Sequence, residues 1–254
     1  MPAPPPSVEL SKWYLDVATP DGRCAIVYAA RLRFLRASVH VHGLLLLGAS
    51  GLRSRWSLLD GRPPRVEGTR LRFASPALGV NARLDAIDPP FEARLHQEAG
   101  GVVEWDCRIP RGEAEIRIGG ETLRGLGYAE RLRITLPPWE LSIRELRWGR
   151  LLSPAGGLVW IEWKGASPLR LALRDGRPAS LDDVGDGQVS VDGFAHPLAP
   201  VATLRDAPLS RTLPAALRRS LPRIGLGLSE TKWLARGDLA GMEGLAIHEV
   251  VRWP

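Results

Sequence analysis

The sequence predicts an all-β protein made of antiparallel strands, on three observations. Apolar and polar residues alternate over many short segments, which is the period of a strand with one buried face. Pairs such as Asp-Gly and Gly-Gly, which favour the positive φ angles of tight hairpins, recur between those segments. Hydrophobic residues make up 44% and charged residues 24% of the 254 residues, so the chain can form a sizeable core. Sheets with this many strands usually close or pair, which predicts β-barrels or sandwiches with very little helix.

In the first half of the chain, the segments 31–36 and 70–73 alternate arginine with apolar residues. Each is predicted to be a strand whose arginine face is solvated and whose other face is buried. Pro20-Asp21-Gly22 and Asp60-Gly61 are predicted to be turns, because Asp and Gly accept the conformations that tight turns need.

The second half repeats the pattern. Alternation predicts strands over 131–136, 169–174, 189–191 and 246–253, and the pairs at 119–120, 175–176 and 192–193 predict the turns. The best helical signal is short and covers 213–220, where Pro214 suits a first turn.

The length suits two consecutive β domains. The glycine-rich stretch 119–127 is the predicted boundary, which gives an N-terminal domain over residues 1–124 and a C-terminal domain over 125–254, and residues 153–157 are the alternative boundary. A short internal echo supports two halves, since Lys12-Trp13 near the start resembles Lys232-Trp233 near the end.

The formal charge of +6 comes from 34 basic and 28 acidic residues, but the basic residues are dispersed along alternating strands. A nucleic-acid partner needs them gathered on one face, so none is expected. The longest apolar run, residues 43–48, is too short to cross a bilayer, which takes about 20 residues. No signal-peptide pattern precedes it, so we expect a cytoplasmic protein without a transmembrane segment; peripheral membrane contact and oligomeric state stay open.

Metal and cofactor chemistry have little support in the sequence. Cys24 and Cys107 lack a CxxC or Cys/His spacing, so they are expected to be free thiols, with a single disulfide as the alternative. His40 and His42 share a strand face without a third ligand nearby, so no metal site is predicted. Neither a nucleophile elbow nor a P-loop is present, and no cofactor is expected.

The densest group of candidate residues lies between 125 and 150. Gly125 and Gly127 precede an alternating strand rather than a helix, so they are expected to permit a bulge or a close backbone approach, not to bind a phosphate. Tyr128 and Glu130 are two residues apart and share a strand face, while Arg131 points to the other. A carboxyl group buried beside a phenol has its protonated form favoured, as a general acid requires. A structural ion pair between Glu130 and an arginine is the alternative.

Two further residues are candidate proton carriers. Asp16 shares a face with Tyr14 near the start of the chain and is a second candidate acid. His248 has an ordinary pKa near neutrality and is either a proton carrier or a structural histidine on the last strand.

Four motifs together resemble a known family: Trp13-Tyr-Leu-Asp16, Gly125-x-Gly-Tyr-x-Glu-Arg131, Leu146-x-Trp-Gly-Arg150, and Lys232-Trp233 followed by His248-Glu249. They resemble the lipocalin-like superfamily of carotenoid 1,2-hydratase (hydroxyneurosporene synthase), with tocopherol cyclase and lipocalin-like Diels-Alderases as looser relatives. The resemblance implies two consecutive lipocalin-like, calycin-type β domains around an apolar pocket. The family motif usually reads Gly-x-Gly-Tyr-x-Asp-His, whereas Glu130 and Arg131 stand here, so the resemblance implies a relative of the hydratase rather than the hydratase itself.

The resulting hypothesis is a cofactor-independent lyase or isomerase that protonates a double bond of an apolar, isoprenoid- or polyene-like ligand. Glu130, Tyr128, Asp16 and His248 are its candidate catalytic residues. The candidate ligand-binding residues are aromatic or basic residues in or beside the motifs: Trp13, Tyr14, Arg131, Trp139, Arg147, Trp148, Arg150 and Trp233. Aromatic faces would stabilise a developing cation. A non-catalytic carrier of a hydrophobic small molecule is the main alternative, and a purely structural β protein is a third.

Overall fold

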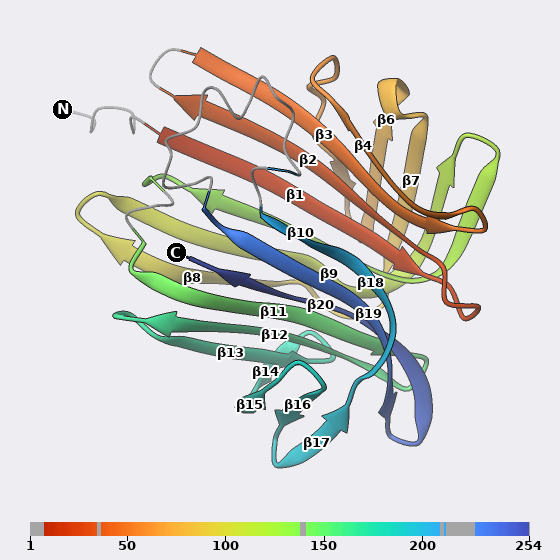
Figure 1. Cartoon of the computed structure of the whole chain (residues 1–254), viewed down its shortest axis with the longest axis vertical. Coiled ribbons are helices and arrows are strands. Elements are labelled where there is room, and N and C mark those ends of the chain that lie inside the picture. The colour runs from red at the N-terminus through yellow and green to blue at the C-terminus, as the bar shows by residue number, and fades with distance from the viewer. Residues whose placement is uncertain (1–7, 35–36, 138–140, 209–210, 212–226, 254) are drawn as a thin grey trace.

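The structure, a computed structural model, describes residues 8–34, 37–137, 141–208, 211 and 227–253. Nearly all of this part of the chain is antiparallel β-sheet, which confirms the predicted fold class (Figure 1). The predicted helix at 213–220 lies outside the described residues. Among the residues described, no helix is long and apolar enough to cross a lipid bilayer.

Three sheets contain the strands. The ten-stranded first sheet has the order β4-β3-β2-β1-β10-β9-β7-β6-β5, with β8 paired to β9. Its strands are β1 Val8–Ala18, β2 Cys24–Phe34, β3 Ala37–Gly48, β4 Gly51–Ser57, β5 Arg65–Glu67, β6 Arg70–Ser75, β7 Val80–Ala86, β8 Phe91–Glu98, β9 Gly101–Ile118 and β10 Glu121–Ile134, with a 3-10 turn at Pro76–Leu78.

The seven-stranded second sheet has the order β14-β13-β12-β11-β20-β19-β18, and β15, β16 and β17 form a small third sheet. These strands are β11 Ile143–Ser153, β12 Gly156–Gly165, β13 Leu169–Arg174, β14 Arg177–Ala179, β15 Leu181–Val184, β16 Gln188–Val191, β17 Phe194–Pro197, β18 Ala199–Pro208, β19 Ser229–Leu239 and β20 Met242–Arg252. In Figure 1 the second sheet lies below β1–β3 and the small sheet lies at the bottom.

Tight turns form at four of the five predicted places, at residues 20–22, 119–120, 175–176 and 192–193, whereas Asp60 and Gly61 lie in an irregular stretch without a turn. Asp175 and Gly176 join β13 to β14, and Asp192 and Gly193 join β16 to β17, with positive φ at all four residues. Two consecutive positive φ angles define the hairpin turn that matches the twist of paired strands. The Asp-Gly pairs therefore fix the register of both hairpins.

The first sheet bends over itself and encloses a core of its own. Leu15 of β1 and Val27 of β2 pack in one cluster with Phe73 of β6 and Val80 of β7. The bend lies in β9, which advances six residues between its pairings with Gly127 and Arg131 while β10 advances four. Bulges of this kind bend a strand and redirect its side chains.

A second core lies between the first and second sheets. It brings Tyr14 and Tyr128 of the first sheet together with Trp148 and Leu234 of the second. We call this cluster the shared core. A third, smaller core covers the outer face of the second sheet, where Trp160 packs with Val189 of the small sheet. The two halves of the chain are thus joined by apolar packing.

The predicted boundary between residues 124 and 125 falls inside β10. All of β10 pairs within the first sheet, and the chain enters the second sheet only at Ile143. A division into two domains, which we retain as a proposal, is better drawn between Ile134 and Ile143.

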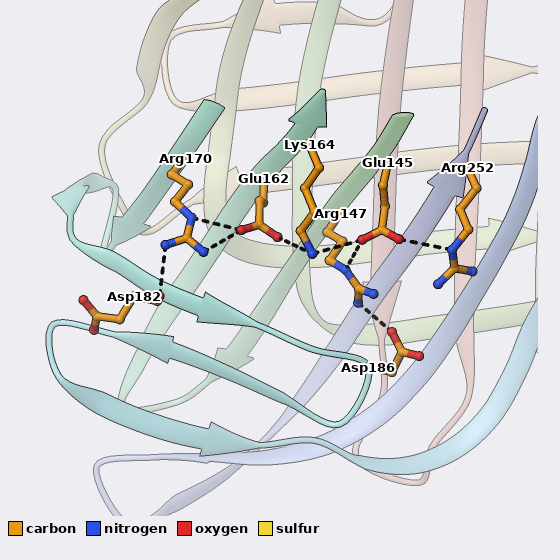
Figure 2. A network of polar contacts seen from close by, with 8 residues as sticks. All are labelled: Glu145, Arg147, Glu162, Lys164, Arg170, Asp182, Asp186 and Arg252. Atoms are coloured by element: carbon orange, nitrogen blue, oxygen red, sulfur yellow. Dashed lines mark hydrogen bonds and ion pairs between the residues drawn. The ribbon is translucent and has the colours of Figure 1, made fainter. Parts of the chain in front are cut away.

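A ladder of alternating charges crosses the outer face of the second sheet (Figure 2). Glu145 lies between Arg147, at 2.8 Å, Lys164, at 3.2 Å, and Arg252, at 3.1 Å. Arg147 also binds Asp186, in the turn between β15 and β16, at 2.6 Å. The ladder joins β12, β11 and β20 by ion pairs between basic and acidic residues.

Candidate active site between the two large sheets

Glu130 lies in the shared core and accepts three hydrogen bonds on one oxygen. Its Oε2 is 2.6 Å from the Tyr128 hydroxyl, 2.6 Å from Nε1 of Trp105 and 3.2 Å from Nε1 of Trp148. Tyr128 comes from the same face of β10, Trp105 from β9, and Trp148 from β11 of the second sheet. Both sheets therefore contribute to the environment of this carboxyl group.

The environment of Glu130 favours its protonated form. Burial is the largest effect and raises its pKa, while Lys12 and the hydrogen bonds from Tyr128 and Trp105 act in the opposite direction. Within the described part of the chain no Lys or Arg nitrogen lies within ion-pair distance of this carboxyl group. The three donors share Oε2, so the proton of the neutral acid is expected on Oε1.

Asp16 is buried in an ion pair that joins the two sheets. Both of its oxygens accept hydrogen bonds from Arg150, at 2.7 and 3.2 Å, and both side chains are fully buried. Arg150 also donates to the carbonyl oxygen of Leu245 at 2.6 Å. A carboxylate held by a bidentate guanidinium is engaged on both oxygens, so its geometry suits positioning rather than proton donation.

Glycine at position 127 allows this arrangement. A side chain there would collide with the carbonyl oxygen of Asp16 and with the Cβ of Ala114. The register shift between β10 and β9 begins at the same residue. The expected roles of the glycine motif, a close backbone approach and a bulge, are both observed.

An open cavity of about 730 Å³ lies at one end of the shared core. Leu126 lines it from the first sheet, and Arg150, Leu152 and Leu245 line it from the second. The remaining lining residues include a charged set: Arg83, Asp85, Glu113, Glu115, Arg124 and Glu243. Its described lining includes neither a tryptophan nor Glu130, so it differs from the Trp-lined pocket that the sequence predicted.

Two predicted ligand-binding residues lie on the opposite face of the first sheet from Glu130. Trp13 is buried in the core that the first sheet encloses. Arg131 pairs with Trp13 across the strands and donates a hydrogen bond from Nε to the Ser11 hydroxyl at 3.3 Å. Strand alternation separates these residues from Tyr14 and Tyr128, which face the shared core.

Three other predicted residues lie on the outer face of the second sheet. His248 stacks on Trp233 with ring centroids 4.9 Å apart, and burial lowers its pKa to about 4. A histidine with this pKa is neutral near pH 7 and is a poor proton donor. Arg147 is held by the charge ladder on the same face. Trp139 lies outside the described residues.

Sequence reasoning missed Trp105 and Lys232. Trp105 shares a strand face with Val103 and Cys107, so alternation alone could have placed it inward, but nothing local connects it to Glu130. Lys232 is buried in the shared core and belongs to the Lys-Trp echo, but the echo by itself does not indicate a buried lysine. Cys107 is a free, buried thiol, as expected.

No protein-family model matches the chain, and no curated protein matches it in sequence. Solved structures do show a shared fold. An AttH-like protein of Nitrosomonas europaea is 11% identical with a TM-score of 0.58, and the match covers 96% of this chain and 92% of that one.

Kievitone hydratase from Nectria haematococca is 13% identical with a TM-score of 0.54, over 97% of this chain and 89% of that one. CghA is 12% identical with a TM-score of 0.54, over 98% and 89% of the two chains. The matches span almost the whole chain, so they confirm the lipocalin-like all-β fold.

Proposed function

We propose that the protein is a cofactor-independent lyase or isomerase of the hydratase or cyclase type, with Glu130 as its acid. The observation that carries the proposal is the buried carboxyl group of Glu130, which has neutral hydrogen-bond donors and a raised pKa. A buried neutral carboxylic acid is what protonation of an unactivated double bond requires. The shared fold with a hydratase supports the proposal.

The proposed reaction begins when Glu130 transfers its proton to one carbon of a double bond in an apolar, isoprenoid- or polyene-like substrate. The other carbon becomes a cation, which the π faces of Trp105 and Trp148 stabilise. Water or a nucleophilic group of the substrate then bonds to the cation. The proton released in that step returns to Glu130 and restores the neutral acid.

The open cavity is the proposed entrance. Arg150 and Leu152 form part of its wall, and Trp148 lies two residues further along the same face of β11. On β1, Tyr14 lies two residues from Asp16 on the same face, as Trp148 lies two residues from Arg150 on β11. The rings of Tyr14 and Trp148 are 4.9 Å apart. A substrate entering here meets Asp16 and Arg150 first and then the aromatic residues beside Glu130, so Tyr14, Trp148 and Arg150 are the proposed ligand contacts.

The test uses a panel of isoprenoid alcohols and conjugated polyenes incubated with the protein in D₂O. Mass spectrometry should detect either addition of D₂O or an isomer that carries carbon-bound deuterium. Glu130→Gln keeps the size of the side chain but removes the acid, and should lower turnover by about 100-fold or more. Native mass spectrometry should show that this variant still binds the same ligand.

Glu121→Gln is the matched control, since Glu121 begins the same strand and pairs on the surface with Arg53 at 2.7 Å. It should leave turnover unchanged. Unchanged turnover in Glu130→Gln would contradict the role of this acid. Ligand retention by the wild-type protein without any conversion would instead identify a carrier.

A further inference from the structure

A second polar cluster in the shared core centres on Lys232 of β19. Its Nζ is buried and forms ion pairs with Glu249 and, at 3.4 Å, with Glu230. The same nitrogen lies 5.3 Å from the ring centroid of Tyr14 and 5.8 Å from that of Tyr28. Burial lowers the pKa of Lys232, but Glu249 and Glu230 outweigh that effect and raise it, so the ammonium group stays charged.

Two more cations surround Tyr28. Nζ of Lys12 lies 5.8 Å and the guanidinium carbon of Arg205 lies 6.0 Å from its ring centroid. The echoed Lys-Trp pairs therefore place Lys12 and Lys232, from opposite sheets, beside one ring. Arg205 and Lys232 form ion pairs with Glu230 and Glu249, whereas Lys12 has no carboxylate within ion-pair distance among the described residues. The ammonium group of Lys12 is therefore the cation of this cluster that no described carboxylate pairs.

The hydroxyl groups of Tyr14 and Tyr28 are buried without a hydrogen-bond partner in the described part of the chain. Their side chains are 2% and 8% exposed. Burying a hydroxyl group without a hydrogen-bond partner is unfavourable, so two such groups in one cluster point to a ligand that accepts from them. Burial raises the pKa of both phenols, so both remain protonated and available as hydrogen-bond donors.

We propose that Tyr14, Tyr28 and Lys232 bind one anionic oxygen group, such as a carboxylate or an enolate, on an otherwise apolar ligand. The two phenols supply hydrogen-bond donors, and the ammonium groups of Lys232 and the unpaired Lys12 supply positive charge. The ring systems of Trp148 and Trp56 supply apolar surface, since Trp148 packs on Tyr14 and Trp56 stacks on Tyr28 at 5.9 Å. The statement that this anionic ligand is the substrate rests on the proposed function. Binding of an anion to these residues does not depend on proton transfer by Glu130.

Anion binding here would also support an acid at Glu130. A negative charge in the shared core disfavours a second one nearby, so the bound group raises the pKa of Glu130 further. The substrate class is then an apolar molecule with one anionic oxygen group, rather than a pure hydrocarbon. The negative charge of the bound substrate would favour the protonated form of Glu130 until its proton is transferred.

The test compares 2-naphthoate with 2-naphthamide, which has the same ring and nearly the same shape but no charge. Isothermal titration calorimetry on the full-length protein should show naphthoate binding about tenfold more tightly or better. Tyr14→Phe and Tyr28→Phe should each weaken naphthoate about tenfold and weaken naphthamide less, because the neutral amide oxygen accepts weaker hydrogen bonds than a carboxylate. Neither variant should lower the unfolding temperature, because the hydroxyls removed have no partner within the described protein.

Arg124→Gln is the control for binding in the open cavity, which Arg124 lines while paired with Glu115 at 2.7 Å. It should leave the affinity for naphthoate unchanged. Equal affinity for the two probes, no detectable naphthoate binding, or an affinity unaffected by both phenylalanine variants would overturn the proposal. The two proposals can also fail separately. If the protein prefers naphthoate but Glu130→Gln does not lower turnover, the anion site is supported and the role of Glu130 as the acid is contradicted.

Discussion

At the scale of single residues, Gly127 makes a direct prediction about stability. Its backbone lies so close to Asp16 and Ala114 that no side chain fits without displacing β1 or β9. Gly127→Ala should therefore lower the free energy of unfolding by about 2–3 kcal/mol, as overpacking in a well-packed core does. Urea unfolding followed by tryptophan fluorescence measures the change.

Gly120→Ala is the matched control, because a Cβ there meets no atom within 4 Å. Its free energy of unfolding should stay within about 0.5 kcal/mol of the wild-type value. Equal stability of the two variants would contradict the close approach at Gly127.

The faces of individual residues were predictable, and their long-range partners were not. A period of two places Tyr128 and Glu130 on one side of β10 and Arg131 on the other, as observed. The indole donors to Glu130 come from Trp105 and Trp148, which are 25 and 18 residues away on other strands. Contacts of this kind depend on how the sheets bend and pack, which local alternation does not encode.

At the scale of elements, the charge ladder on the second sheet predicts a response to acid. Burial raises the pKa of Glu145, but hydrogen bonds and charge from Arg147 and Lys164 outweigh it and lower the pKa to about 2. The ordinary value is about 4.3, so the stability that Glu145 contributes is present above that pH and is lost as the pH falls towards 2.

Glu145→Gln should therefore lower stability near pH 6 and reduce the loss of stability between about pH 4.3 and 2. Chemical unfolding at several pH values measures both effects. Glu67→Gln is a useful comparison, since Glu67 is exposed and its contact with Arg72 is 3.8 Å long. Identical acid dependence in wild type and Glu145→Gln would contradict the importance of the ladder.

The hairpins were more predictable than the arrangement of the sheets. Asp175-Gly176 and Asp192-Gly193 form turns because their residues adopt positive φ at low cost. The bend in β9 has no comparable signal, although Pro110 lies within it and proline is typical of bulges. The glycine-rich stretch at 119–127, the predicted domain boundary, contains the turn between β9 and β10 and the start of a bulge, because glycine is as typical of turns and bulges as of linkers.

At the scale of the whole molecule, the pair formed by Asp16 and Arg150 joins the two large sheets. Removing one partner leaves an uncompensated buried charge, so Arg150→Met and Asp16→Leu should each cost about 3–5 kcal/mol. The double variant leaves no unpaired charge, so its loss of unfolding free energy should be well below the sum of the losses in the two single variants. A double-mutant cycle from urea unfolding measures the coupling.

A simple sum of the two single losses would contradict direct coupling across the sheets. Arg111 offers a comparison at the same junction, since it binds Asp88 in the first half at 2.8 Å and the carbonyl oxygen of Pro154 in the second at 3.1 Å. Its side chain is less buried than that of Arg150, so Arg111→Met should cost less.

The proposed role of Glu130 as an acid requires that its pKa is raised between the two sheets. Wild-type protein with ¹³C-labelled glutamate side chains, compared with Glu130→Gln, identifies the carboxyl resonance of this residue. Its pH titration should give a midpoint clearly above the ordinary glutamate pKa of about 4.3, because burial favours the protonated form. A midpoint at or below that value would show a structural carboxylate and contradict the account.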